Sequence, residues 1–298
     1  MDEGVEMDEG RRALVGIPLA LVLGALLALA GSHHGATLGA VPLFALAVLA
    51  AFGVQWIAFV PAYLRQTEVF YDLTGSITYV VVTAALLALT PERDARAVLL
   101  AALVVVWALR LGPFLYRRIR RAGRDDRFDE IKPSLPRFLL VWTVQGLWVT
   151  FTAMAAWSGI TSGARRELDA LAVVGVALWL VGFALEVTAD AQKSRFRADP
   201  ANAGRFISTG LWSRSRHPNY AGEILLWLGV ALVAAGALTG WQWVALASPL
   251  FVALLITRVS GVPLLEKKAE ARWGGQPDYE EYVRTTPVLV PSLLPRRG

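Results

Sequence analysis

The stretch ALVGIPLALVLGALLALA, residues 13–30, runs for eighteen positions without a charged side chain. About 17–25 apolar residues in a helix cross the hydrocarbon core of a bilayer, where the backbone must satisfy its own hydrogen bonds. The stretch could also be the apolar part of a signal peptide. However, no small-residue cleavage site precedes the following GSHHG, and further apolar stretches follow at once. We therefore predict a membrane-spanning helix that stays in the protein.

Seven more apolar stretches follow this one. Hydrophobic residues make up 55% of the 298 positions and charged residues 18%, whereas soluble domains have about 45–50% and about 25%. The sequence predicts an all-α, polytopic membrane helix bundle with about eight spans, within a range of seven to nine because the third and eighth are short. We expect an acidic tail at 1–12, the bundle at 13–260 and a C-terminal cytoplasmic segment at 261–298. The further spans are expected near 38–60, 74–90, 97–115, 137–158, 170–189, 219–237 and 242–258.

Lysine and arginine are distributed very unevenly over the connections between these spans. With eight spans, 24 of the 29 basic residues fall on one side of the membrane, and Arg110 lies within the fourth span. The positive-inside rule then predicts that both termini are cytoplasmic. Most of these arginines need no role beyond binding anionic headgroups. The opposite side holds only Arg93, Arg96, Arg165 and Arg166.

Several classes of site are missing from the sequence. The chain has no cysteine, which excludes disulfides, thiolate catalysis and cysteine-bound zinc. It also lacks a glycine-rich dinucleotide loop, a Walker loop, HExxH and GxSxG. We therefore expect no metal and no nucleic-acid partner. The abundance of Ala, Arg, Leu and Val suggests a bacterial protein, which would be a multi-pass protein of the inner membrane.

The sixth span ends in a row of charged residues. Glu186, Asp190, Lys193 and Arg197 follow one another at intervals of four, three and four, which places them on one helical face. A helix that leaves the membrane with intrahelical ion pairs would explain Lys193 and Arg197. Glu186 lies a turn deeper among apolar residues, where a charge usually faces a bundle interior. We interpret Glu186 and Asp190 as functional.

The segment SRSRHPNYAGEILLW, residues 213–227, brings polar groups to the start of the seventh span. Proline favours the first turn of a helix, so Pro218 marks its beginning. The N–H groups and the positive dipole end of such a turn attract an anion, and Arg216 and His217 come just before it. Asn219 and Glu223 then run inward on one face. This pattern exceeds what capping requires and predicts a ligand site.

Two further segments offer candidate residues with open alternatives. Arg110 either extends to headgroups or binds a phosphate or carboxylate inside the bundle, and Arg127 lies in the polar stretch GRDDRFD, which suits a loop over an anionic ligand. The segment YLRQTEVFYDLTG carries Glu68, Tyr71 and Asp72. It is either an ordinary loop in which Asp72 caps the next helix, or the source of a catalytic acid.

Taken together, these segments resemble the steroid 5-alpha-reductase-like membrane family, in its uncharacterised bacterial branch. The resemblance is carried by GLWSRSRHPNYAGEILLW, EVTADAQKSRF, YRRIRRAGRDDRFDEIK, YDLTGSITY and the tail SGVPLLEKKAEARWGGQPDYEEYVRTTPVLVP, and it covers about residues 63–291. It implies a helical membrane reductase that uses NADPH without a Rossmann domain. The cofactor would lie in a cytoplasm-facing cavity that the C-terminal segment closes.

Carried over position by position, the resemblance implies a set of site residues. Asp72, Glu68 and Tyr71 would supply the acid, although the family's early glutamate has only Glu68 and Asp72 as counterparts here and Trp107 stands where the family has a tyrosine. For the substrate we therefore expect only the general class, a lipophilic, steroid- or isoprenoid-like molecule. By the resemblance, the cofactor residues would be Arg110, Glu186, Asp190, Arg197, Arg216, Asn219, Tyr220, Glu223, Glu266 and Tyr279. Arg127, Lys193 and His217 join this set because of their charge and their place in the sequence.

Two alternatives stand beside the reductase. The Arg-His-Pro-x-Tyr pattern also resembles integral-membrane methyltransferases of the isoprenylcysteine and phospholipid type, which bind S-adenosylmethionine in a similar pocket. A non-catalytic lipid-binding membrane protein is the other. The Glu186–Asp190 pair and the many arginines favour NADPH, because S-adenosylmethionine carries no phosphate. The expected partners are a lipophilic small molecule and membrane lipids, and a monomer is compatible with the sequence.

Overall fold

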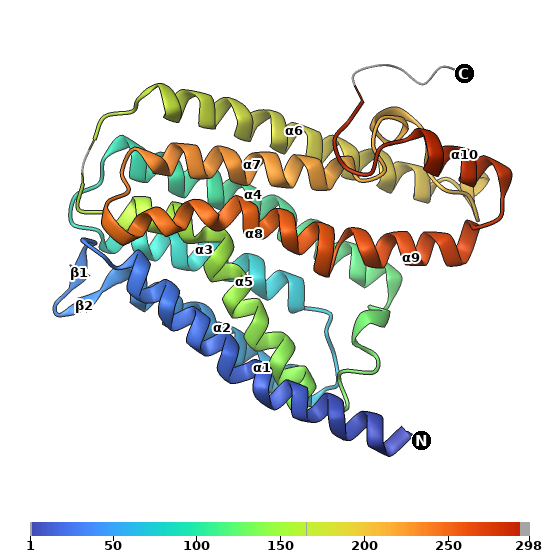
Figure 1. The fold of residues 1–298 in the computed structure, drawn as a ribbon, viewed down its shortest axis with the longest axis horizontal. Helices are drawn as coiled ribbons and strands as arrows, with labels where there is room; N and C mark the ends of the chain where they lie inside the picture. Colours follow the sequence, from blue (N-terminus) through green and yellow to red (C-terminus); the bar gives the residue numbers. More distant parts are fainter. Residues whose placement is uncertain (1, 165, 293–298) are drawn as a thin grey trace. The chain divides into compact units, whose positions relative to one another are not determined.

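The computed structural model describes residues 2–164 and 166–292, with side chains from Gly10 on, and consists almost entirely of helices (Figure 1). Among these residues, eight helical segments are long and apolar enough to cross a membrane. This confirms the prediction of an all-α membrane bundle. The eight segments are Gly10–Gly31, Leu43–Leu64, Tyr71–Leu89, Ala95–Ala122, Leu135–Thr161, Ala170–Ala198, Pro218–Ala235 and Gly240–Trp273.

The helices run further than hydropathy alone indicated. The fourth continues well past its apolar part, and the sixth includes all five charged residues between Glu186 and Arg197 in the helix. The eighth segment combines a 3-10 helix, a short α-helix and a π-helix before α9. The elements are α1 Asp2–Gly31, β1 Thr37–Leu38, β2 Val41–Pro42, α2 Leu43–Leu64, α3 Tyr71–Leu89, α4 Ala95–Ala122, η1 Asp126–Phe128, α5 Leu135–Thr161, α6 Ala170–Ala198, η2 Pro200–Asn202, η3 Gly210–Ser213, α7 Pro218–Ala235, η4 Gly240–Ala247, α8 Ser248–Leu254, η5 Leu255–Val259, α9 Val262–Trp273 and α10 Pro277–Thr285.

The chain forms two compact units. The first unit comprises Met1–Ala172 with Val233–Ser248, and the second comprises Val173–Leu232 with Pro249–Gly298. In the first unit, α3 packs on α4, and α1 and α2 pack on α5. One hydrophobic core cluster of this unit is built from Phe59, Ala62, Phe128, Phe138 and Trp142.

Arg96 is a buried structural residue of the first unit, although hydropathy placed it in a connection. It lies in the first turn of α4, is 0% exposed, and donates to the carbonyls of Val233 and Glu167 at 2.6 Å each. It also bonds to the Asp169 carboxylate at 3.2 Å. The N–H of Ala172, and then Arg96, hold the pKa of Asp169 below its usual value. Of the other basic residues assigned to that side, Arg165 lies outside the described residues.

The second unit contains an unusually close helix pair. Gly182 of α6 faces Gly222 of α7, and a Cβ atom added to Gly222 would lie 2.5 Å from the Gly182 carbonyl oxygen. The two backbones therefore touch with no side chain between them. Seven residues away on each helix, Gly175 and Gly229 repeat the contact. This spacing keeps the glycines on one face of each helix, so the close approach extends along the pair.

Candidate functional site

The close α6–α7 pair of the second unit brings acidic and amide side chains together. Asn219 Nδ2 of α7 donates to Asp190 Oδ1 of α6 at 3.2 Å. Glu186 lies one turn deeper on α6 and is 2% exposed, while Glu223 is half-buried one turn further along α7. The helical spacing in the sequence predicted that these residues share faces, and the helix packing now places the two faces opposite each other.

A second cluster joins the segment before α7 to α9. The Glu266 carboxylate accepts a hydrogen bond from Arg216 Nη1 and lies 2.6 Å from His217 Nε2. The His217 ring stacks on Tyr220, with centroids 5.6 Å apart. Burial lowers the pKa of His217 below its ordinary value, and the charges of Lys193 and Arg216 add to this, although Glu266 opposes it.

Three polar atoms of these clusters are buried and unsatisfied. Arg216 Nε, His217 Nδ1 and Asn219 Oδ1 have no hydrogen-bond partner among the described residues. Leaving such a group without a partner costs about 1–3 kcal/mol, and more when the group is charged. A ligand that offers acceptors to Arg216 and a donor to Asn219 would remove this cost.

The C-terminal segment lies against the start of α7. The backbone N–H groups of Arg216 and His217 donate to the carbonyls of Pro287 and Val288, at 2.9 and 3.1 Å. Ser215 Oγ donates to the Leu289 carbonyl at 2.8 Å. Pro218 begins α7, as its position predicted. Because the two N–H groups before it are bonded to the C-terminal segment, a ligand here would be recognised mainly by side chains.

The remaining predicted cofactor residues of the second unit surround these clusters less directly. Lys193 Nζ lies 4.2 Å from the centroid of the Trp212 ring. Arg197 is exposed near the end of α6. Tyr279 of α10 is buried, and its ring packs against Phe206 at 5.3 Å. Tyr279 is therefore part of the packing that holds α10.

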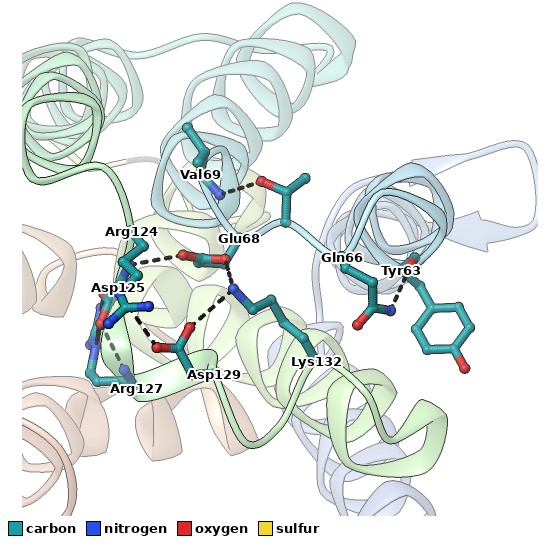
Figure 2. A network of polar contacts seen from close by, with 10 residues as sticks. Tyr63, Gln66, Glu68, Val69, Arg124, Asp125, Arg127, Asp129 and Lys132 are labelled. Carbon is teal, nitrogen blue, oxygen red and sulfur yellow. Dashed lines mark hydrogen bonds and ion pairs between the residues drawn. The ribbon is translucent and has the colours of Figure 1, made fainter.

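Glu68, one of the predicted catalytic residues, holds two segments of the first unit together (Figure 2). It is 4% exposed, accepts from Lys132 Nζ at 2.6 Å and accepts from the Asp125 N–H at 2.8 Å. Lys132 also pairs with Asp129 at 3.3 Å. The network fixes the segment 123–134 to the loop before α3. Lys132 was not predicted, because its partner is 64 residues away in the sequence.

Tyr71 and Asp72 lie at the start of α3. The Tyr71 hydroxyl donates to the Val141 carbonyl at 3.1 Å, and its ring packs between Phe128 and Trp142. Asp72 lies 4.0 Å from Arg118. The N-cap of α3 is Phe70, so the alternative in which Asp72 caps the helix is wrong: the helix begins one residue before Asp72.

The two arginines predicted to bind the cofactor from the first unit are engaged locally. Arg110 lies over the Phe114 ring at 5.0 Å. Arg127 Nε bonds to Asp125 at 2.9 Å, and its guanidinium lies over Phe128. Partial burial favours a higher pKa for Asp125, but its bonds to Arg127 hold the pKa below the usual value.

Sequence reasoning also missed Gln55. It lies in the middle of α2, is 0% exposed, and donates to Thr78 Oγ1 of α3 at 2.8 Å. The signal that could have found it is a glutamine within an apolar 22-residue helix. Among the described residues, no group of three or more His, Asp or Glu side chains could hold a metal ion.

Comparison with known proteins gives one family and one distant relative. A family model described as "Protein of unknown function (DUF1295)" matches residues 58–286, well over half of the chain. "Uncharacterized protein C594.04c" of Schizosaccharomyces pombe is 27% identical over 176 residues, which cover 49% of this chain and 51% of the yeast protein. The chain thus spans about half the length of that relative. No solved structure matches it.

Proposed function

Because this chain belongs to the DUF1295 family, which is steroid 5-alpha-reductase-like, we propose that it is a membrane-embedded reductase. It would use NADPH to reduce an activated C=C bond of a lipophilic, steroid- or isoprenoid-like substrate. When bound, NADPH would supply the hydride. We place the protein in the bacterial inner membrane with both termini in the cytoplasm; an alkaline phosphatase fusion at the C-terminus that is active would contradict this orientation.

The observation that carries this proposal is the Asp190–Asn219 pair with its unsatisfied amide oxygen. A buried carboxylate and a buried Asn219 Oδ1 together offer acceptors for the two N–H donors of a carboxamide. The nicotinamide ring carries such a group. Arg216, with its unsatisfied Nε, offers a donor for the phosphates of the same cofactor. The residues of the second unit therefore fit a nicotinamide dinucleotide.

The proton that accompanies the hydride needs an acid. Of the three predicted residues, Glu68 has both carboxylate oxygens engaged, Oε1 by the Asp125 N–H at 2.8 Å and Oε2 by Lys132 Nζ at 2.6 Å, so neither is directed at a substrate. Asp72 has a longer, 4.0 Å pairing with Arg118. We therefore assign the acid to Asp72, with Glu68 holding the segment 123–134 in place and Tyr71 bonded to Val141.

Thermal stabilisation of the purified full-length protein by NADPH tests this function. A ligand at a hundred times its Kd stabilises the folded state by about 2.7 kcal/mol, and NADH should stabilise it less. Asn219→Ala and Asp190→Asn should abolish the stabilisation while leaving the protein folded. Arg120→Ala, an exposed position on α4, is the matched control. Unaltered NADPH binding in both site variants would remove this pair from the site.

A second candidate, an S-adenosylmethionine-dependent methyltransferase, is favoured by one specific observation. Among the predicted cofactor residues of the second unit, the four carboxylates of Glu186, Asp190, Glu223 and Glu266 outnumber the three cations of Lys193, Arg197 and Arg216. An acidic surrounding suits the sulfonium and ammonium charges of S-adenosylmethionine. Stabilisation by this compound, with none by NADPH, would establish the methyltransferase. If neither NADPH nor S-adenosylmethionine stabilises the protein, the non-catalytic lipid-binding protein is the alternative that remains.

A further inference from the structure

Glu266 pairs with the two basic side chains, Arg216 and His217, that directly precede α7. Its carboxylate reaches both Arg216 and His217 from α9, so a single residue neutralises the group that would bind an anion. Arg216 and His217 are 13% and 6% exposed, but Glu266 is 30% exposed. The carboxylate can therefore move into water more readily than the two groups that hold it.

The pairing with Arg216 is incomplete. Glu266 bonds to Nη1, while Nε of the same guanidinium is buried and has no hydrogen-bond partner among the described residues. A guanidinium presents its N–H donors as a planar fork, which a carboxylate or phosphate satisfies best with two oxygens at once. Glu266, shared with His217, does not do this. An oxyanion that bonded Nε and Nη1 at the same time would therefore be a better acceptor than Glu266.

The helix that carries Glu266 follows an irregular segment. The π-helix Leu255–Val259 ends at Ser260, and Gly261 then adopts φ −79°, ψ −86° before α9 begins at Val262. A π-helix is rare and frequently lies at a functional site. This break in the regular helix separates α9, which carries Glu266, from the apolar helix α8.

We propose that Glu266 is a displaceable internal anion: it holds the oxyanion subsite of Arg216 closed, and a phosphoryl group of the ligand takes its place. This rests on the proposed function for the identity of the dinucleotide, but the subsite itself requires only an oxyanion. The affinity of the site is then set by competition. A ligand binds with its intrinsic Kd divided by the fraction of molecules in which Glu266 has left.

Binding of inorganic pyrophosphate and of NADPH to the detergent-solubilised full chain, measured by calorimetry, tests the proposal. Glu266→Gln removes the competing charge and is expected to tighten pyrophosphate about tenfold, as when the open fraction rises from about a tenth to nearly all molecules. Glu270→Gln, which removes the same charge from an exposed position one turn further along α9, should change it less than twofold. Arg216→Lys should bind pyrophosphate about tenfold more weakly, because a lysine ammonium lacks the planar fork of N–H donors.

Several results would overturn the proposal. Weaker or unchanged pyrophosphate binding in Glu266→Gln would show that Glu266 is a binding or purely structural residue. If that variant does not fold, Glu266→Asp, whose shorter side chain cannot reach both Arg216 and His217, must tighten pyrophosphate binding instead. The proposed function fails separately: tighter pyrophosphate without any NADPH binding keeps the subsite and removes the reductase. NADPH binding without tighter pyrophosphate binding in Glu266→Gln keeps the reductase and removes the proposed role of Glu266.

Discussion

Replacing Gly222 by alanine should separate α6 from α7 and open the Asp190–Asn219 pair. The added Cβ would lie 2.5 Å from the Gly182 carbonyl oxygen, whereas ordinary contact begins at 3.4 Å, a shortfall of 0.9 Å. The obstacle is backbone, which cannot rotate away as a side chain can. The Asn219–Asp190 bond is already 3.2 Å long, so a shift of this size would break it.

The expected loss of stability follows from two opposing effects. Forcing an extra carbon into a packed interface costs about 1–3 kcal/mol, while alanine in a helix interior is favoured over glycine by about 0.5–1 kcal/mol. We expect a net destabilisation of about 1–2 kcal/mol in Gly222→Ala. Gly53→Ala, in α2, is the matched control, because no atom lies within 4 Å of its added Cβ. It should be stabilising by up to about 1 kcal/mol.

Two measurements check this prediction. Unfolding by titration with sodium dodecyl sulfate should shift in opposite directions for Gly222→Ala and Gly53→Ala. NADPH affinity should fall in Gly222→Ala and stay unchanged in Gly53→Ala. If Gly222→Ala is as stable as the wild type and retains its affinity, the helices do not touch through their backbones and the reasoning is wrong.

Two further predictions concern charged residues in each unit. Lys132→Met should leave the buried Glu68 carboxylate without its ion pair, cost about 3 kcal/mol, and speed tryptic cleavage within 123–134; the same rate as in Lys267→Met, an exposed control, would argue against the network. His217 should make stability depend on pH, because burial lowers its folded pKa below the ordinary 6.5. The unfolded chain then takes up the proton first, so the free energy of unfolding falls as pH drops below 6.5, and His217→Gln should flatten that part of the curve. An unchanged slope in that variant would refute the assignment.

The sequence predicted the features that depend on neighbours along the chain. The apolar stretches gave eight spans, because a bilayer of fixed thickness admits only long helices with internal hydrogen bonds. Pro218 marked the start of α7, and spacing put Glu186 and Asp190 on one face of α6. These features need no knowledge of what the helix packs against. The true ends of α4 and α6 were missed. An apolar stretch ends at the first charged residues, whereas the helix continues as long as its backbone hydrogen bonds are formed.

The tertiary structure decided which distant residues meet. Arg96 looked like a residue of a connection, yet it is buried because carbonyls more than 70 residues away accept its N–H groups. Glu68 was predicted as a candidate acid from its own segment alone, and the tertiary structure adds that Lys132, 64 residues away, bonds to its carboxylate. Glu266 reaches Arg216 across 50 residues. Helical periodicity relates residues only within one helix. Which residue of a second helix pairs with a charged side chain depends on how closely the two helix backbones pack. At α6 and α7 that distance is set by two facing glycine pairs, Gly182–Gly222 and Gly175–Gly229. The seven-residue spacing within each helix puts its glycines on one face, but it does not say which helix that face meets.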